Sequence, residues 1–187
     1  SVAWDIVQLA PTTRPGEFRL WVLVDRQLHV LKLNVPRQFY VNFVQLPKPG
    51  LLRDTYRAEA VTRVLPRGAT PRHLMHITVS EEEFRKDDAH FSALVNHPNV
   101  DGVYEMQVPL DVRAIIQLGA SCKLRPGAKL SHAMDTGLAL SDLTHASHAH
   151  STYLRGGQVM RTVYLYHASD KKRHVLVLVN SDGQVYV

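Results

Sequence analysis

The first third of the chain alternates short apolar runs with turn residues. Two segments, "VAWDIVQLA" (2–10) and "EFRLWVLVDRQLHVLKLNVPRQFYVNFVQL" (17–46), are rich in Val, Leu, Trp and Phe. The sequences "PTTRPGE" and "DRQ" that interrupt them are typical of turns. The pattern predicts three strands in a meander, with residues 39–44 as a fourth strand beyond the break that Pro36 imposes.

The next stretch predicts a loop and two further strands. "PKPGLLRDTYRAEA" (47–60) has the composition of a loop, and "AVTRVLP" (60–66) resumes as a strand. In "HLMHITV" (73–79) the side chains alternate between two sets, which predicts a strand with one buried face.

A helix is predicted over residues 81–96. Ser80 is a good N-cap, Glu83 completes a capping box, and acidic residues in the first turn suit the positive end of the helix dipole. Four apolar side chains fall on one face at helical spacing. They are Phe84, Phe91, Leu94 and Val95.

A short strand in "VYEMQV" (103–108) and a second helix in "PLDVRAIIQLG" (109–119) follow. Pro109 is expected at the first helical position and Gly119 just past the end. This helix is apolar around most of its circumference, which predicts that it is largely buried. The residues expected to have buried structural roles are Tyr104, Val112, Ile115, Ile116 and Leu118.

The last third predicts one weak helix and three strands. "SHAMDTGLALSDLTHASHAH" (131–150) reads as a helix weakened by Gly137, and "RTVYLYHA", "RHVLVLVN" and "VYV" read as strands. The fold class is therefore α+β: a β-rich N-terminal meander, a strand–helix–strand–helix unit, and terminal strands.

Composition changes this picture little. The chain has 187 residues, enough for one compact domain with a small second piece, and 22 Lys and Arg against 17 Asp and Glu give a net charge of +5. That charge is compatible with nucleic acid but does not require it. A single cysteine fits a reducing compartment, and no apolar run is long enough to span a bilayer. The absence of an initiator Met and the terminal "GQVYV" suggest a fragment of a longer polypeptide.

The histidine-rich stretch "THASHAHS" is the most conspicuous candidate for a metal site. His145, His148 and His150 are spaced i, i+3 and i+5, which neither a helix nor a strand places on one face. Asp142 is the only nearby carboxylate and His132 is remote. A zinc site needs three or four convergent ligands, so no metal is expected here.

Catalytic motifs are likewise not apparent. Cys122 lies in "LGASCKL", which reads as strand or core, and not beside a base that would activate a thiol. The Asp-Thr-Gly at Asp135 precedes a segment that reads as helical, and no glycine-rich phosphate loop is present in the sequence. No catalytic residue, metal or cofactor is therefore expected in this segment.

A basic run between residues 53 and 72 is offset only by Asp54 and Glu59. Tyr40 and Tyr56 add faces on which the bases of single-stranded nucleic acid can stack, although a solvated loop is the alternative. The candidate contacts for nucleic acid or a partner are Arg37, Tyr40, Arg53, Arg57, Arg63, Arg67 and Arg72.

Several blocks resemble, in the same order, a segment of the catalytic subunits of DNA polymerase epsilon, in their second, non-catalytic half. The blocks are "LNVPRQFYVN", "RVLPR", "NVDGVYEMQVPLDVRAIIQLG" and "RTVYLYHA". Within them Arg37, Arg63 and Arg67 are expected to bind nucleic acid, an acidic partner surface, or the domain's own carboxylates.

The resemblance implies a domain assignment. Those subunits look like two tandem B-family polymerase modules, the second inactive. Residues 1–155 would be the N-terminal-type domain of the degenerate module, and 156–187 the first strands of a vestigial exonuclease-like sheet. A live exonuclease of that family carries Asp-x-Glu on its first strand, whereas "TVYLYHAS" carries no carboxylate and Asp170 only follows it. Two-metal chemistry needs convergent carboxylates, so an inactive remnant is expected.

The resemblance also implies a role and partners. The expected function is a non-catalytic scaffold in leading-strand DNA replication in the nucleus. The expected partners are the rest of the polymerase polypeptide, its accessory subunits and the replicative helicase, with DNA as a further candidate. The alternative is an independent module that binds single-stranded nucleic acid through the arginines and tyrosines.

Overall fold

A computed structural model describes residues 2–45, 51–64, 70–128, 137–146, 163–169, 174–180 and 185–186. The chain divides into two compact units, Ser1–Ala146 and Ser147–Val187. The boundary predicted after residue 155 lies outside the described residues. No helix in the described ranges is both long and apolar enough to cross a membrane.

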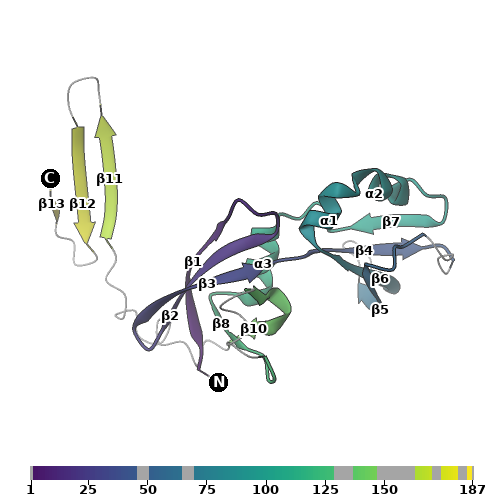
Figure 1. Ribbon diagram of the computed structural model, residues 1–187, viewed down its shortest axis with the longest axis horizontal. Helices are drawn as coiled ribbons and strands as arrows, with labels where there is room; N and C mark the ends of the chain where they lie inside the picture. The colour runs from purple at the N-terminus through teal and green to yellow at the C-terminus, as the bar shows by residue number, and fades with distance from the viewer. Residues whose placement is uncertain are drawn as a thin grey trace. The chain divides into compact units, whose positions relative to one another are not determined.

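The first sheet of the larger unit is built on the predicted meander (Figure 1). Its strands run in the order β10-β8-β1-β2-β3-β9. Their bounds are β1 Trp4–Pro11, β2 Glu17–Val24, β3 Gln27–Asn34, β8 Ser121–Leu124, β9 Leu138–Ala139 and β10 Leu143–His145. Asp25 and Arg26 form the predicted tight turn between β2 and β3, and both have positive φ, as a two-residue hairpin turn requires.

Helix α3 (Leu110–Leu118) packs on this sheet through one face only. Its Leu110, Ala114 and Leu118 are buried among the apolar side chains of the strands. The expectation that α3 is largely buried is wrong for three of the residues expected to have buried structural roles, because Val112, Ile115 and Ile116 are 41%, 56% and 76% exposed. A helix lying on a sheet buries a stripe, and these three residues point away from that stripe.

The ends of α3 agree closely with the prediction. Pro109 is the N-cap, one position before the expected one, and Gly119 is the C-cap. Gly119 has φ 67° and ψ −151°, a conformation that essentially only glycine adopts. A Cβ there would also lie 2.7 Å from Nδ1 of His145.

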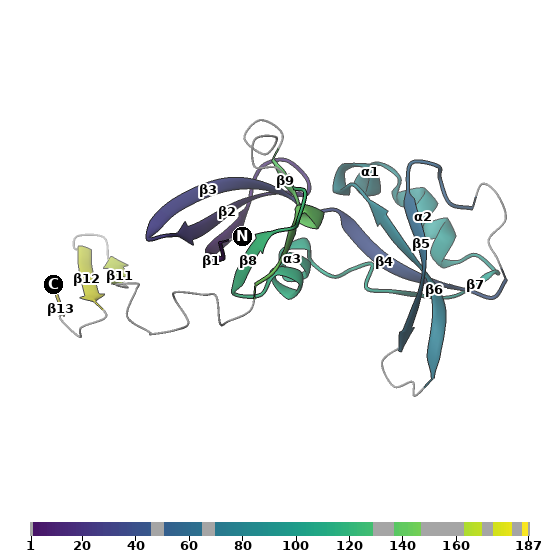
Figure 2. The ribbon, with the colours of Figure 1, turned by 90° about the horizontal axis from the view of Figure 1, so that it is seen from below.

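The second sheet of this unit has the order β5-β6-β4-β7, with two short helices over one face (Figures 1 and 2). The bounds are β4 Arg37–Phe43, β5 Arg57–Val64, β6 Pro71–Val79, β7 Val100–Tyr104, α1 Glu81–Lys86 and α2 Asp88–Val95. The helices bury Phe91 and Leu94 against Phe39, Val41 and Ile77.

Three predicted boundaries in this region need correction. The single helix over 81–96 is two helices that meet at Asp87 (φ −111°, ψ 27°). Residues 57–60, expected in a loop, begin strand β5. The strand expected over 103–108 instead covers Val100–Tyr104 and ends at Glu105, where φ is +64°.

The helix predicted over 131–150 is wrong wherever the chain is described. Residues 138–145 form β9, a 3-10 turn η1 (Leu140–Asp142) and β10. Leu138, Leu140 and Leu143 are buried in the core of the first sheet, while β9 pairs with β3 and β10 pairs with β8. Pairing with existing strands therefore overrides the weak helical pattern. His132, Asp135, His148 and His150 lie outside the described residues.

The smaller unit contributes a three-stranded antiparallel sheet of β11 (Val163–Ser169), β12 (His174–Asn180) and β13 (Val185–Tyr186). This confirms the three strands predicted at the end of the chain. Their kinship with an exonuclease sheet remains a prediction.

Candidate functional site

The second sheet sorts the predicted contact residues onto two opposite faces. Residues directly opposed on neighbouring antiparallel strands share a face. Glu59, His76, Tyr40 and Tyr104 are opposed across all four strands, so they form one row on the face away from the helices. Flanking rows on the same face contain Arg57, Thr78 and Gln38 on one side and Arg63 and Arg72 further along.

Arg37 is the first residue of β4 and lies on the helix-covered side. Its guanidinium binds groups of the same unit. Its Nε and Nη2 donate to the two carboxylate oxygens of Glu81 at 2.9 and 3.0 Å, and its Nη1 donates to the carbonyls of Met106 and Val108. Its guanidinium also sits 4.9 Å from the centre of the Phe84 ring. Of the three expected uses of Arg37, the structure shows binding to the domain's own carboxylate.

The carboxylate of Glu81 binds two arginines of the larger unit, Arg37 and Arg85. Its side chain is 3% exposed and also accepts from Nε of Arg85 at 3.0 Å. A Cβ at Gly16, in the β1–β2 turn, would lie 2.9 Å from Cβ of Glu81, so the turn and α1 are in close contact. The Arg37–Glu81 pair therefore ties together β4, α1 and the β7–α3 connection.

Arg53 and Tyr56 are also engaged inside the domain. Both donate to the carboxylate of Asp87, Tyr56 through its hydroxyl at 2.7 Å. The Arg53 and Tyr56 hydrogen bonds hold the pKa of Asp87 below its ordinary value. Burial, and then the bond to Asp87, raise the pKa of Tyr56. The Tyr56 ring is buried and stacks on Phe91, so it offers no free face for a base.

Among the predicted contact residues, Tyr40 lies on the open face of the sheet and its ring contacts another ring. Its ring stacks on that of His76, with centroids 4.8 Å apart and an interplanar angle of 24°. Arg57 pairs with Glu59 at 2.5 Å, and Arg72 lies 3.6 Å from Asp101. Arg67 lies outside the described residues.

A groove of about 320 Å³ opens over this face. One wall is the sheet, and the other is built from the end of α3, the residue after β8 and η1. The lining includes Gln38, Arg57, Glu59, His76 and Thr78 from the sheet and Gln117, Arg125, Leu140 and Ser141 from the other wall.

His76 sits in this groove with an unusual electrostatic environment. Its Nε2 is buried and has no hydrogen-bond partner among the described residues. Burial lowers the pKa of His76, and the charges of Arg113 and Arg63 act in the same direction against Glu59 and Glu105. The neutral imidazole is therefore favoured.

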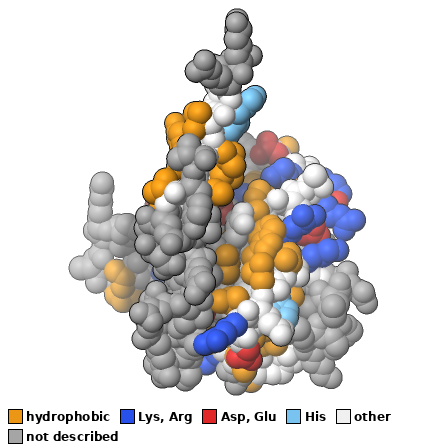
Figure 3. Space-filling view, turned by 90° about the vertical axis from the view of Figure 1, so that its left-hand side faces the viewer, with side chains coloured by type: hydrophobic (Ala, Val, Ile, Leu, Met, Phe, Trp, Pro, Cys, Tyr) orange, Lys and Arg blue, Asp and Glu red, His pale blue; other side chains and the backbone are white. Residues whose placement is uncertain are grey.

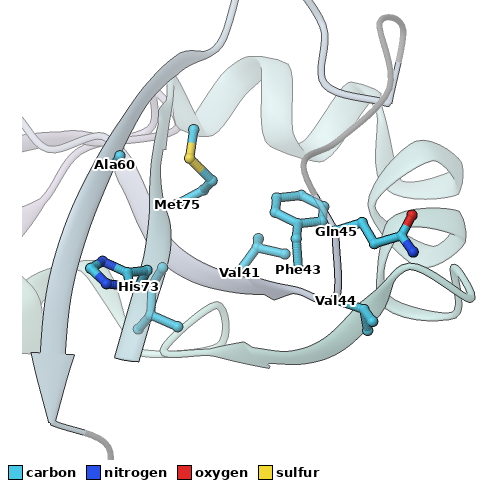
Figure 4. A pocket seen from close by; sticks show the side chains of 8 residues that line it. Val41, Phe43, Val44, Gln45, Ala60, His73 and Met75 are labelled. Carbon is cyan, nitrogen blue, oxygen red and sulfur yellow. The ribbon is translucent and has the colours of Figure 1, made fainter. Parts of the chain in front are cut away.

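A smaller pocket of about 200 Å³ lies at the other end of the sheet (Figure 4). Its walls come from β4, β5 and β6 and are mainly apolar, with Val41, Phe43 and Met75 in view. His73 is the one ionisable group among its described lining residues, and its Nδ1 lies 3.2 Å from the Thr62 hydroxyl. This arrangement offers no paired acid and base for catalysis.

Cys122 and His145, two candidate reactive residues in the sequence, lie in settings that do not favour reactivity or metal binding. Cys122 is fully buried, and burial raises the pKa of its thiol to about 12, against reactivity. His145 lies 3.2 Å, through Nδ1, from the carbonyl of Leu118. Within the described ranges no three His, Cys, Asp or Glu side chains gather as a metal site would need.

The residues that sequence reasoning missed are the polar partners of Tyr40. Alternation in "HLMHITV" separates His76 and Thr78 from the buried Ile77 and Val79, so the pattern contained the signal. Gln117 and Arg125 reach the groove through tertiary structure alone.

The surface drawn in Figure 3 carries exposed hydrophobic side chains and a separate group of Lys and Arg side chains.

Comparison with known proteins gives a consistent assignment. No family model matches the chain. It is 36% identical over 180 residues to a DNA polymerase epsilon catalytic subunit of Aspergillus fumigatus, 34% over 180 residues to that of Emericella nidulans, and 31% over 175 residues to one from Arabidopsis thaliana. These matches cover 94–95% of the chain, which spans only 8% of the length of each relative.

The fold has a solved counterpart. It superposes on the family B DNA polymerase of the archaeon Pyrobaculum calidifontis with a TM-score of 0.58 and 18% identity, covering 100% of this chain and 26% of that one. At that identity the match supports the fold alone. The sequence matches go further: over nearly its whole length the chain is similar to one segment of the much longer DNA polymerase epsilon catalytic subunits.

Proposed function

We propose that this chain is a non-catalytic, structural segment of a DNA polymerase epsilon catalytic subunit that supports leading-strand DNA replication and replisome assembly in the nucleus. The carrying observation is that the ionic side chains at the centre of the larger unit bind one another. Arg37 and Glu81 are 12% and 3% exposed and join three parts of the unit, an arrangement that serves architecture.

Strand β11 supports the absence of a catalytic role. It has the sequence "VYLYHAS", without a carboxylate at the place where the family resemblance would put the metal-binding pair. We expect no cofactor in this segment. The proposed partners are the remainder of the polymerase polypeptide, its accessory subunits and the replicative helicase.

The test is an Arg37→Ala substitution in the polymerase polypeptide that carries this chain. Removing one member of a buried ion pair leaves the other charge unpaired, which costs about 3–5 kcal/mol. We expect a lower melting temperature and weaker co-purification of accessory subunits, with the primer-extension rate per folded molecule unchanged. Arg14→Ala is the matched control, because Arg14 is 79% exposed in its pair with Glu17. A lost extension rate in a variant that still melts like the original would contradict a structural role.

A further inference from the structure

The outer face of the first sheet carries apolar side chains that its core does not use. Every second residue of β2 and β3 belongs to the buried core, and the residues between them face the opposite way, because side chains alternate along a strand. On this outer face Trp21 lies opposite Val30, and Leu23 lies opposite Leu28. These four residues are called the outer patch. Leu28 and Val30 are 58% and 54% exposed, so the patch is open to a partner.

Strand β3 also has an unpaired backbone edge. Along Gln27–Asn34 it pairs with β2 on one side. On its other side β9 pairs only with Leu33 and Asn34, at the end of the strand, and no further strand of the described ranges lies beside β3 (Figure 2). The N–H and C=O groups of such an edge can bind a strand from another chain. Edge and patch coincide, since Leu28 and Val30 stand on β3 itself.

Two basic side chains border the outer patch. The next row on this face of the hairpin is Arg19 opposite Lys32. Both residues are exposed, and neither has an ion pair or a side-chain hydrogen bond within the described part of the chain. Glu17, one row further, already accepts from Thr12 Oγ1 at 3.0 Å and lies 3.9 Å from Arg14. A partner that covers the patch therefore meets two unpaired positive charges, which complement a carboxylate.

We propose that this surface binds an extended segment of a partner protein, in which apolar residues alternate with polar ones and an acidic residue flanks them. The segment adds to the edge of β3, and its apolar side chains cover Leu28 and Val30. Its carboxylate pairs with Arg19 and Lys32. A second copy of this chain suits the surface less well, because it brings the same positive charges to it. The inference does not depend on the scaffolding role proposed above.

The test uses the peptide Glu-Thr-Val-Thr-Val-Thr-Val-Thr-Glu, whose two acidic ends allow either strand direction. Binding of the fluorescein-labelled peptide to the 187-residue chain is measured by anisotropy, and the unlabelled peptide is used to follow tryptophan emission. We expect saturable binding with a change in emission that Trp21→Phe abolishes. A peptide with Lys in place of both Glu residues should bind about tenfold more weakly, because like charges meet. A peptide with Pro at its centre should also bind about tenfold more weakly, because Pro cannot donate to a strand.

Substitutions in the chain locate the binding. Val30→Asp places a carboxylate within the outer patch and should weaken binding of the acidic peptide about tenfold. Lys32→Glu should weaken the acidic peptide and strengthen the Lys peptide, each about tenfold. Ile116→Asp is the matched control and should change either affinity less than about twofold, because Ile116 is 76% exposed on α3, which packs on the opposite face of the sheet. All three positions are exposed, so the variants should keep the fold, which a thermal melt checks.

Three results with the peptides would overturn the proposal. They are no binding of the acidic peptide even at millimolar concentration, equal binding of the Lys peptide, and a loss in Ile116→Asp equal to that in Val30→Asp. Sedimentation measures self-association of the chain in parallel. Self-association that Val30→Asp abolishes, without binding of the acidic peptide, would assign the surface to a second copy and would likewise overturn the proposal.

Discussion

Asp87 illustrates how single residues hold this domain together. It lies at the break between α1 and α2. There its carboxylate accepts hydrogen bonds from Arg53 and Tyr56, which lie in the loop before β5. The loop is thereby fastened to the helices that cover the sheet. Hydrogen bonds from Arg53 and Tyr56 to the charged carboxylate explain why the pKa of Asp87 is lowered.

This pKa shift predicts a pH-dependent difference between the original chain and Asp87→Asn. A carboxyl whose folded-state pKa is lowered contributes stability above its ordinary pKa of 3.8, and that contribution is lost as pH falls through the folded-state pKa. The original chain should therefore melt at a higher temperature than Asp87→Asn at neutral pH. The gap should close under acid conditions below pH 3.8.

Asp54→Asn provides the comparison for this measurement. Asp54 is exposed in the same loop and has no hydrogen bond or ion pair with a described residue. Its variant should melt like the original chain at neutral pH. A gap for Asp87→Asn that stays constant from neutral to acid pH would show that the charge of Asp87 is not what fastens the loop.

In helix α3 the pattern of apolar residues does not determine which face of the helix is buried. Buried positions fall at Leu110, Ala114 and Leu118, spaced four residues apart, while Ile115 and Ile116 are exposed between them. The sequence alone presents apolar residues on all sides of the helix. Only the position of the first sheet decides which side is covered.

Two substitutions in α3 should therefore differ sharply. Leu118→Ala leaves a cavity in the core and should lower the free energy of unfolding by about 2–5 kcal/mol. Ile116→Lys changes a residue that is 76% exposed and should alter it by no more than about 0.5 kcal/mol. Urea unfolding of both variants measures the two values. Similar losses would mean that the outer face of α3 is also packed in the folded chain.

The same elements show how far sequence patterns reach. Alternation and turn chemistry predict β1, β2, β3 and β6, and the cap of α1 is confirmed, since Ser80 Oγ accepts from the Glu83 amide at 3.1 Å. The pattern over 131–150 misleads because β9 and β10 are very short and exist through pairing with distant strands. Local sequence preferences do not encode such partners.

The candidate site is less predictable from sequence, for a related reason. The basic run and the tyrosines contain Tyr40 and Arg57, but also Arg53 and Tyr56, which bond to Asp87 instead. Tyr40 and Arg57 stand on strands and lie on the open face of the sheet, whereas Arg53 and Tyr56 lie in the loop before β5. Arg125 reaches the groove from the far wall, and no local pattern links it to Tyr40.

At the scale of the molecule, the chain is similar to one small segment of much longer proteins. It matches nearly its whole length to 8% of the polymerase epsilon catalytic subunits. Its larger unit contains two sheets, and in the second of them Arg37 of β4 forms a bidentate ion pair with Glu81 of α1. The role that we propose for it is non-catalytic.

The most direct test of that role is an activity assay on the purified chain. An end-labelled primer–template is incubated with the folded chain, Mg²⁺ and all four deoxynucleotides, and separately without nucleotides, and the primer length is followed with time. The account predicts neither extension nor shortening above a buffer control. Extension or shortening that depends on Mg²⁺ and rises in proportion to the concentration of the chain would contradict it.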